Sequence, residues 1–220
     1  MKKFSLTAIS LLALTFFFLT GCATNRGIVS LDVPKVSTQI PSNGKQVYIQ
    51  SVIDERVFQE NPKTQDIPSL GFGGASQATA DLKKRAIGRK RNTYGKALGD
   101  ILLEEGQTVE TVITDALKQS YTETGYQVLD NENEIKDNTI IVTATIQKFW
   151  AYMTPGFWAI TLTSDISSNI TIKDPSKNDT ATKEVTVQSE GKYQIASESN
   201  WMEVVHQSLQ KFIAEVKKFI

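Results

Sequence analysis

Three long β-branched stretches in the second half of the chain constrain the fold more than any other feature. Residues 139–150, 157–173 and 182–195 are rich in Val, Ile and Thr, and much of their length alternates apolar with polar positions. Such alternation is typical of strands that bury one face. Turn-forming residues separate the stretches, first at Thr154-Pro155-Gly156 and then over residues 174–179. The sequence therefore predicts a meander of three strands.

Two amphipathic helices flank this meander. Residues 108–124 carry apolar side chains at helical spacing, begin with a threonine that can cap the helix, and are followed by Gly125 in a position to end it. A second apolar stripe runs from Asn200 to about Phe219, and Asn200 with Glu203 predicts a capping box at its start.

The other segments complete a single domain over residues 45–220. Residues 47–53 and 126–129 predict two further strands, whereas residues 76–107 predict a long basic excursion from the core. Two amphipathic helices can cover one face of a sheet. We therefore expect an α+β fold, a two-layer sandwich whose mainly antiparallel sheet is covered on one face by two helices.

The first 21 residues have the pattern of a signal peptide. Lys2 and Lys3 precede an almost wholly apolar run over residues 6–19. That run is shorter than the roughly 20 apolar residues that a transmembrane helix needs. Residues 22–44 are rich in Ser, Thr, Pro, Asn and Gly, which predicts a flexible tether before the domain.

Cys22 is the only cysteine, which excludes a disulfide within the chain and a cysteine-rich zinc site. The only histidine is His206, so a zinc site built on several histidines is excluded as well. Leu19-Thr20-Gly21-Cys22 resembles the bacterial lipobox. This resemblance implies cleavage before Cys22, a diacylglyceryl thioether on its sulfur and an acyl group on its freed amine, with no other cofactor. Ala23 in the next position implies sorting to the outer membrane.

Charge limits the classes of partner. The precursor has 24 basic and 24 acidic residues, and removal of Lys2 and Lys3 leaves the mature chain at −2. Such a chain has no general attraction for nucleic acid. With 40% hydrophobic and 22% charged residues, its composition is that of a globular protein.

A basic cluster marks the excursion, where seven cations lie between Lys83 and Lys96. Arginine forms paired hydrogen bonds to phosphate and carboxylate groups, so the cluster is a candidate site for lipid head groups, lipopolysaccharide or peptidoglycan. The candidate residues are Arg85, Arg89, Lys90 and Arg91. The alternative is a solvated loop whose charge is balanced by the acidic residues at 100, 104 and 105.

Aromatic residues gather around the Pro155-Gly156 turn. Tryptophan and tyrosine suit surfaces that are partly wet, so these side chains are candidates for contact with a partner or with acyl chains. The candidates are Trp150, Tyr152 and Trp158. The alternative, which strand alternation favours, is that the aromatic group packs in the core beneath the helices.

The sequence offers no catalytic constellation. Gly71-Phe72-Gly73-Gly74 lacks the lysine of a phosphate-binding loop, and His206 has no Gly-x-Ser-x-Gly motif to accompany it. Glu104 and Glu105 are adjacent, so on a helix they would point about 100° apart and could not flank one bond. We expect Asp54-Glu55-Arg56 to form a structural ion pair or cap, and we expect no metal site.

The whole pattern resembles the YajG-type family of small bacterial lipoproteins. The matching features are the lipobox at Cys22, a strand that runs into Asp54-Glu55-Arg56, and a helix that ends in residues 124–128. After the meander, Glu190-Gly191-Lys192-Tyr193 leads into the helix at Trp201. The layout is also similar to auxiliary lipoproteins of envelope transport and lipopolysaccharide assembly. The resemblance implies a role in the bacterial envelope and supplies no catalytic residue.

Two hypotheses of different classes follow. In the first, the protein is a non-enzymatic binding or assembly module, held by its lipid in the outer membrane, facing the periplasm and contacting an envelope protein or an anionic polymer. In the second, it is an envelope hydrolase that acts on cell-wall or lipid substrates. A hydrolase needs a concave pocket with convergent acid, base or nucleophile groups, whereas a binding module needs an exposed apolar or basic patch.

Overall fold

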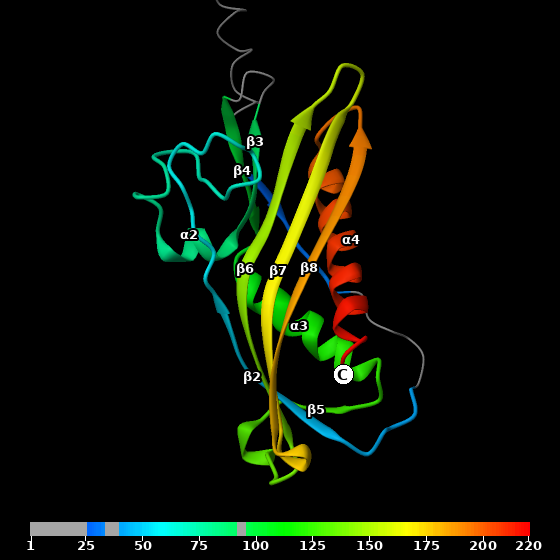
Figure 1. Cartoon of the computed structure of the whole chain (residues 1–220). Coiled ribbons are helices and arrows are strands. Elements are labelled where there is room, and N and C mark those ends of the chain that lie inside the picture. Colours follow the sequence, from blue (N-terminus) through cyan, green and yellow to red (C-terminus); the bar gives the residue numbers. More distant parts are fainter. Residues whose placement is uncertain (1–25, 34–39, 92–95) are drawn as a thin grey trace, which may run out of the picture.

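The computed structural model describes residues 26–33, 40–91 and 96–220 (Figure 1). The predicted signal peptide over residues 1–21, the lipidation of Cys22 and the sorting residue Ala23 lie outside the described residues. No helix in the described part of the chain is both long enough and apolar enough to cross a bilayer.

The described strands form one mixed sheet of eight strands. They are β1 (Gly27–Val29), β2 (Gln46–Asp54), β3 (Ala86–Arg91), β4 (Ala97–Leu103), β5 (Gln127–Leu129), β6 (Ile140–Pro155), β7 (Ile160–Asp174) and β8 (Asp179–Tyr193). The meander β6-β7-β8 is antiparallel along its whole length, as the sequence predicts. Strand β3 pairs with β4 antiparallel, whereas the pairs β1/β4, β2/β5, β2/β6 and β3/β6 are parallel.

Strand β6 is long enough to pair with one strand along one edge and with two strands along the other. One edge pairs with β7 from Ile141 to Pro155. The other edge is shared, because β2 pairs with the first half of β6 and β3 pairs with Ala151 and Tyr152 further along. On this edge the two halves of β6 therefore pair with different strands, and the pairing with β2 ends well before Pro155.

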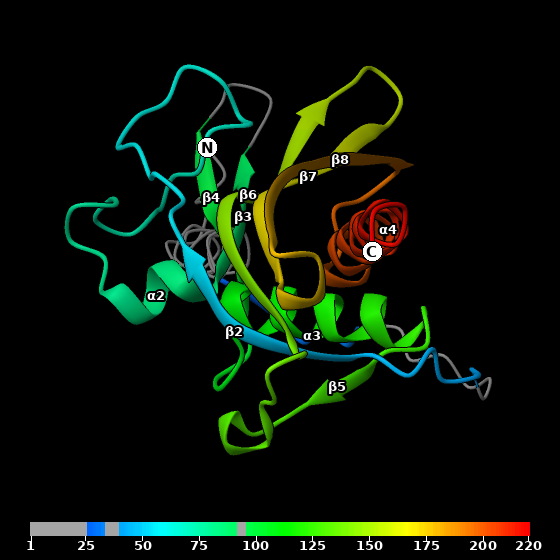
Figure 2. The ribbon, with the colours of Figure 1, turned by 60° about the horizontal axis from the view of Figure 1, so that its bottom comes forward.

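Within the described residues, three α-helices accompany the sheet: α2 (Ala80–Arg85), α3 (Val109–Thr122) and α4 (Glu198–Val216). Helix α3 packs against β2, and α4 packs against β7, β8 and α3 (Figure 2). The buried stripes of α3 and α4 meet the sheet in one main apolar core. The described residues thus form a strand-rich α/β fold of one large mixed sheet with three α-helices, and the expected two-layer sandwich, with a mainly antiparallel sheet covered by two helices, is not confirmed.

Local signals explain where α3 begins and ends. The Thr108 hydroxyl accepts a hydrogen bond from Thr111 N at 3.2 Å, and the Thr111 hydroxyl accepts one from Thr108 N at 3.0 Å. Gly125 has a φ of +84°, and Tyr126 N donates to Tyr121 O at 3.1 Å just after the helix. Glycine suits this left-handed position because it has no Cβ to clash. The predicted cap at Thr108 and the left-handed glycine at position 125 are confirmed, and the helix itself ends at Thr122, two residues before the predicted Thr124.

Helix α4 begins earlier than the sequence predicts. Ser197 caps it, and Asn200 supplies the reciprocal hydrogen bond of the capping box. The predicted box from Asn200 to Glu203 is therefore corrected by three residues, because Ser197 is the stronger candidate once the chain leaves β8 at Tyr193. The helix ends at Val216, before the predicted Phe219.

Two corrections concern the first half of the chain. The predicted excursion over residues 76–107 contains β3 and β4, which lie inside the sheet: Ala86 and Ile87 are fully buried, and β3 pairs with β4 on one side and with β6 on the other. The predicted tether over residues 22–44 contains β1, which pairs with β4, and it also contains the buried residue Leu31. The folded domain therefore begins by Gly27 rather than at residue 45.

A second, smaller core lies on the opposite face of the sheet from α3 and α4. It contains Trp150, Leu70, Ala86 and Leu102, and the half-buried Phe58 packs against it. Residues 149 and 151 belong to the main core, so alternation along β6 turns Trp150 to the other face. The chain between β2 and α2 covers this face and gives the sheet two unequal apolar layers.

Candidate functional site

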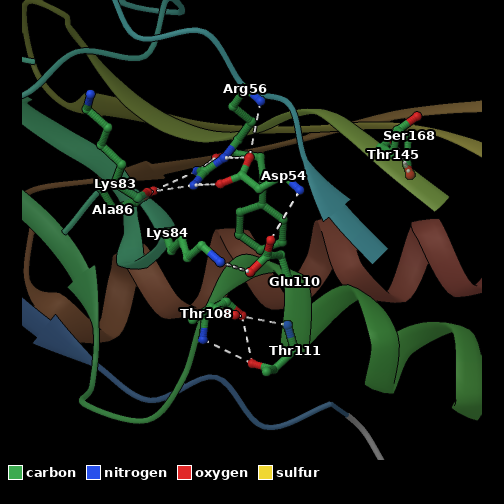
Figure 3. A network of polar contacts seen from close by, with 11 residues as sticks. Asp54, Arg56, Lys83, Lys84, Ala86, Thr108, Glu110, Thr111, Thr145 and Ser168 are labelled. Carbon is green, nitrogen blue, oxygen red and sulfur yellow. Dashed lines mark hydrogen bonds and ion pairs between the residues drawn. The ribbon is translucent and has the colours of Figure 1, made fainter. Parts of the chain in front are cut away.

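Arg56 joins four elements of the fold from a fully buried position (Figure 3). Its Nε and Nη2 atoms each lie 2.8 Å from an oxygen of Asp54. The guanidinium also donates to three backbone carbonyls at 2.6 to 2.9 Å, those of Lys83, Ala86 and Phe149. All of these interactions are internal, so the predicted structural ion pair is confirmed.

A second ion pair extends this network toward α3. Glu110 in the first turn of α3 lies 3.0 Å from Lys84 Nζ and accepts a hydrogen bond from the backbone of Asp54 (Figure 3). An acid at the start of a helix also interacts favourably with the helix dipole. These contacts position α2 and α3 at the end of β2, and they occupy Lys84 with a structural partner.

The predicted basic cluster is divided by the strand that carries it. Arg89 and Arg91 point to one face of β3, where Arg91 donates to the Ser69 hydroxyl at 3.1 Å. Lys90 points to the other face and lies 2.7 Å from Glu198 of α4. Arg85, on α2, donates to Leu103 O at 3.0 Å and pairs with Asp81. The four residues therefore share no common surface, and anion binding by them stays a prediction.

Arg89 lies in a tight polar corner beneath the glycine-rich loop. Burial and the neighbouring charge of Arg91 lower the pKa of its guanidinium below the ordinary value. Asp100 is fully buried beside it, accepts a hydrogen bond from Gly71 N at 2.9 Å and lies 3.4 Å from Arg26. The N–H of Gly71 is thus occupied by an internal carboxylate, whose negative charge would also repel a phosphate group.

The aromatic group is also divided, and Trp150 is the clearest correction. It is 0% exposed, donates to Gln65 O at 3.2 Å and packs edge-to-face on Phe58. A side chain in this position cannot contact a partner. Tyr152 is half-buried, and burial together with the charge of Asp165 raises the pKa of its phenol. Core packing is therefore the correct interpretation for the part of the group that lies on the strand.

Trp158 behaves in the opposite way. It is 82% exposed, and the adjacent Phe157 is 89% exposed, at the turn between β6 and β7 (Figure 1). Their rings pack edge-to-face with centroids 4.8 Å apart. Two large aromatic side chains therefore project into solvent at the end of the molecule, and Trp158 remains a candidate for contact with a partner.

Ile195 belongs to the same exposed end, although the sequence assigned it only to the last strand. It is 68% exposed and follows β8 by two residues. Since the β7/β8 pairing ends at Ile160 and Tyr193, Ile195 leaves the sheet at the same end as the β6/β7 turn. We call Phe157, Trp158 and Ile195 the tip cluster. No sequence pattern marks it, because exposure at a turn depends on which neighbouring segments cover the turn.

Other candidate residues are placed more simply. His206 is half-buried on α4, and its Nε2 atom has no hydrogen-bond partner among the described residues. Within that same part of the chain, no three His, Cys, Asp or Glu side chains gather as metal ligands. A hollow of about 720 Å³ is lined by polar residues of α3, among them Lys118 and Gln119, and by residues 31–33.

Solved structures resemble this one at very low sequence identity. A crystal structure of an uncharacterised protein matches with a TM-score of 0.50 and 9% identity, over 88% of this chain and 97% of the other. A DUF330 protein from Xanthomonas campestris matches more weakly, with a TM-score of 0.47 and 12% identity over 86% of this chain and 91% of the other. A lipoprotein from Neisseria meningitidis has a TM-score of 0.32 and 6% identity, over 78% and 99%.

Sequence comparison adds no closer relative. No protein-family model matches the chain, and no curated protein matches its sequence. The structural likeness shows the fold alone, and membership of the YajG-type family stays a prediction.

Proposed function

We propose that this protein is a non-enzymatic lipoprotein of a bacterial envelope, anchored through Cys22 and acting as a binding or assembly module. It faces the periplasm from the outer membrane, as Ala23 after the lipobox implies. Its contact surface is the tip cluster, which binds a component of the envelope. The membrane through the lipid, and an envelope protein or anionic polymer, are the partners that this location supplies.

The observation that carries the proposal is the exposure of Phe157 and Trp158. A single exposed apolar residue is ordinary in soluble proteins, whereas a contiguous apolar patch at one end of a domain is typical of an interaction surface. Tryptophan and phenylalanine are also enriched where binding surfaces are buried. The pair sits at the turn that closes the long β6/β7 ladder, directly beyond the last strand pair Pro155/Ile160.

The hydrolase hypothesis receives no comparable support from the described residues. The hollow beside α3 is lined by neither histidine nor serine, and the buried polar groups around Arg56 are saturated with internal hydrogen bonds. A hydrolase needs acid, base or nucleophile groups that converge on an open space.

The anchor is tested with the full precursor in a bacterial host. Mass spectrometry of the mature amino terminus should show cleavage before Cys22 and acylation of that residue. The Cys22→Ala precursor should lose the acyl groups and should leave the membrane fraction or remain uncleaved. A mature wild-type chain without acyl groups would refute the anchor.

The contact surface is tested by photo-crosslinking in intact cells. A photoreactive amino acid in place of Phe157 should form adducts with an envelope component. The matched control places the same group at Val57, which is 72% exposed on the loop after β2. Equal labelling from both positions would show that the tip cluster has no special role.

A further inference from the structure

We propose that the tip cluster inserts into the surface of the bilayer that holds the chain's own lipid anchor, so that the domain rests on the membrane at this end of its sheet. The inference rests on the proposed acylation of Cys22 and names the partner of the proposed contact surface. It is carried by the place where the chain enters the fold, by the short reach of the segment before it, and by the chemistry of the exposed side chains.

The strand pairing fixes where the chain enters. Gly27 of β1 lies opposite Ile101 of β4, which lies opposite Gly88 of β3. Gly88 in turn lies opposite Ala151 of β6. Strand β1 is parallel to β4 and therefore runs away from the end of β6 at Pro155. Traced backward from Gly27, the chain heads toward the β6/β7 turn.

A side-chain contact gives the same placement independently. A Cβ on Gly27 would lie 2.9 Å from Glu198 Oε1 and 3.2 Å from Lys90 Nζ, so β1 begins beside the Lys90–Glu198 ion pair. Glu198 is the first residue of α4 and follows Ile195 by three positions. The amino-terminal entry of the domain and the tip cluster are therefore at the same end of the molecule.

The distances along the chain match. From Ala151 to Pro155 are four residues, which span about 13 Å in a strand. Gly27 is level with Ala151, and from Gly27 back to Cys22 are five residues, which span at most about 18 Å when fully extended. The acylated residue can therefore reach the level of the tip but not far beyond it. A lipid on Cys22 therefore brings this end of the sheet to the bilayer surface. The predicted tether of more than 20 residues would instead have held the domain away from it.

The exposed side chains suit that surface. Tryptophan is enriched at the boundary between lipid chains and water, where its ring meets apolar and polar surroundings at once. Phe157 and Ile195 supply the apolar area that deepens such a contact.

The test uses tryptophan fluorescence of the full, acylated protein in vesicles of phosphatidylethanolamine and phosphatidylglycerol, with or without bromine on the acyl chains. The chain has three tryptophans, and Trp150 and Trp201 are both 0% exposed, so Trp158 is the one that can meet lipid or an aqueous quencher. We expect brominated lipid to quench the emission and acrylamide to lose most of its effect on it. Trp158→Phe should abolish both responses.

A matched probe separates insertion from mere proximity. In the Trp158→Phe background, Val57→Trp places a tryptophan at a position of similar exposure on the loop after β2. This probe should remain open to acrylamide and should escape the brominated lipid. If Trp158 and the probe at position 57 responded alike, the tip would not be inserted.

The remaining outcomes are also decisive. The same preparation is checked by mass for acylation of Cys22, so loss of the anchor, which refutes the proposed function, is distinguished from failure of this inference. Acylated protein whose Trp158 stays open to acrylamide refutes insertion alone. Trp158 that is shielded from acrylamide but untouched by brominated lipid shows that a protein surface, such as a second copy, covers the tip, and this also overturns the membrane assignment.

Discussion

Asp54 and Arg56 form a two-point ion pair at the end of β2, with both N–O distances at 2.8 Å and the arginine side chain fully buried. Two residues apart in sequence, they connect β2 to α2, β3 and β6 through the three carbonyls that Arg56 also contacts. A buried charged side chain is tolerated only when each of its hydrogen-bond donors has an acceptor. Here the Arg56 guanidinium alone donates all of these hydrogen bonds.

Replacement of Arg56 should therefore be severe. Arg56→Met leaves a largely buried carboxylate and three carbonyls without their donor, so we expect a loss of roughly 3–5 kcal/mol in the free energy of unfolding. Lys84→Met removes the more exposed pair with Glu110 and should cost no more than about 1 kcal/mol. Urea unfolding followed by circular dichroism measures both. Similar losses in the two variants would contradict the structural role of Arg56.

Two tryptophans on one hairpin should differ sharply. Trp150→Ala empties a buried position and should cost roughly 3–5 kcal/mol of stability. Trp158→Ala removes a side chain that is 82% exposed and should change stability by no more than about 0.5 kcal/mol. Thermal unfolding of the two variants provides the comparison, and a strongly destabilised Trp158→Ala would mean that the tip packs against the fold.

Gly88 is required by a close approach of β3 to β6. A Cβ at this position would lie 2.7 Å from Ala151 O and 3.2 Å from the Trp201 ring. Gly88→Ala must therefore push the strands or α4 apart, at a cost of about 1–3 kcal/mol. Gly71→Ala is the control, since its nearest neighbour would be at an ordinary 3.4 Å. Equal denaturation midpoints for the two variants would show that the strands adjust freely.

The Glu123–Lys217 pair, which joins the carboxyl ends of α3 and α4, predicts a pH effect. Burial raises the pKa of Glu123, but hydrogen bonds from Lys217 and Gln119 outweigh this and hold it below the ordinary 4.5. A lowered pKa in the folded state stabilises the fold above the unfolded-state value, and this stability is lost as the pH falls through the folded-state value.

The comparison with Glu123→Gln isolates this contribution. At pH 7 the wild type should be more stable than the variant by less than about 1 kcal/mol, because both partners are partly solvated. The difference in urea midpoint should shrink as the pH is lowered from 5 to 3. A difference that stayed constant over that range would show that the charge of Glu123 contributes nothing.

Local sequence patterns determined much of the secondary structure of this protein. Alternation gave the β6-β7-β8 meander, and Thr108 with Gly125 gave the limits of α3, because strand and helix periods and caps depend on neighbours within a few residues. The structural role of Asp54 and Arg56 was also predictable. The lipobox at Cys22 remains a prediction from sequence.

The tertiary structure decided what depends on distant partners. Gly27–Val29 and Ala86–Arg91 are short strands whose pairing with β4 and β6 overrides a composition typical of loops. The alternation of β3 divided the basic run between two faces, and the loop after β2 buried Trp150 while Trp158 stayed exposed. Exposure is a property of what covers a side chain, and no local pattern contains that information.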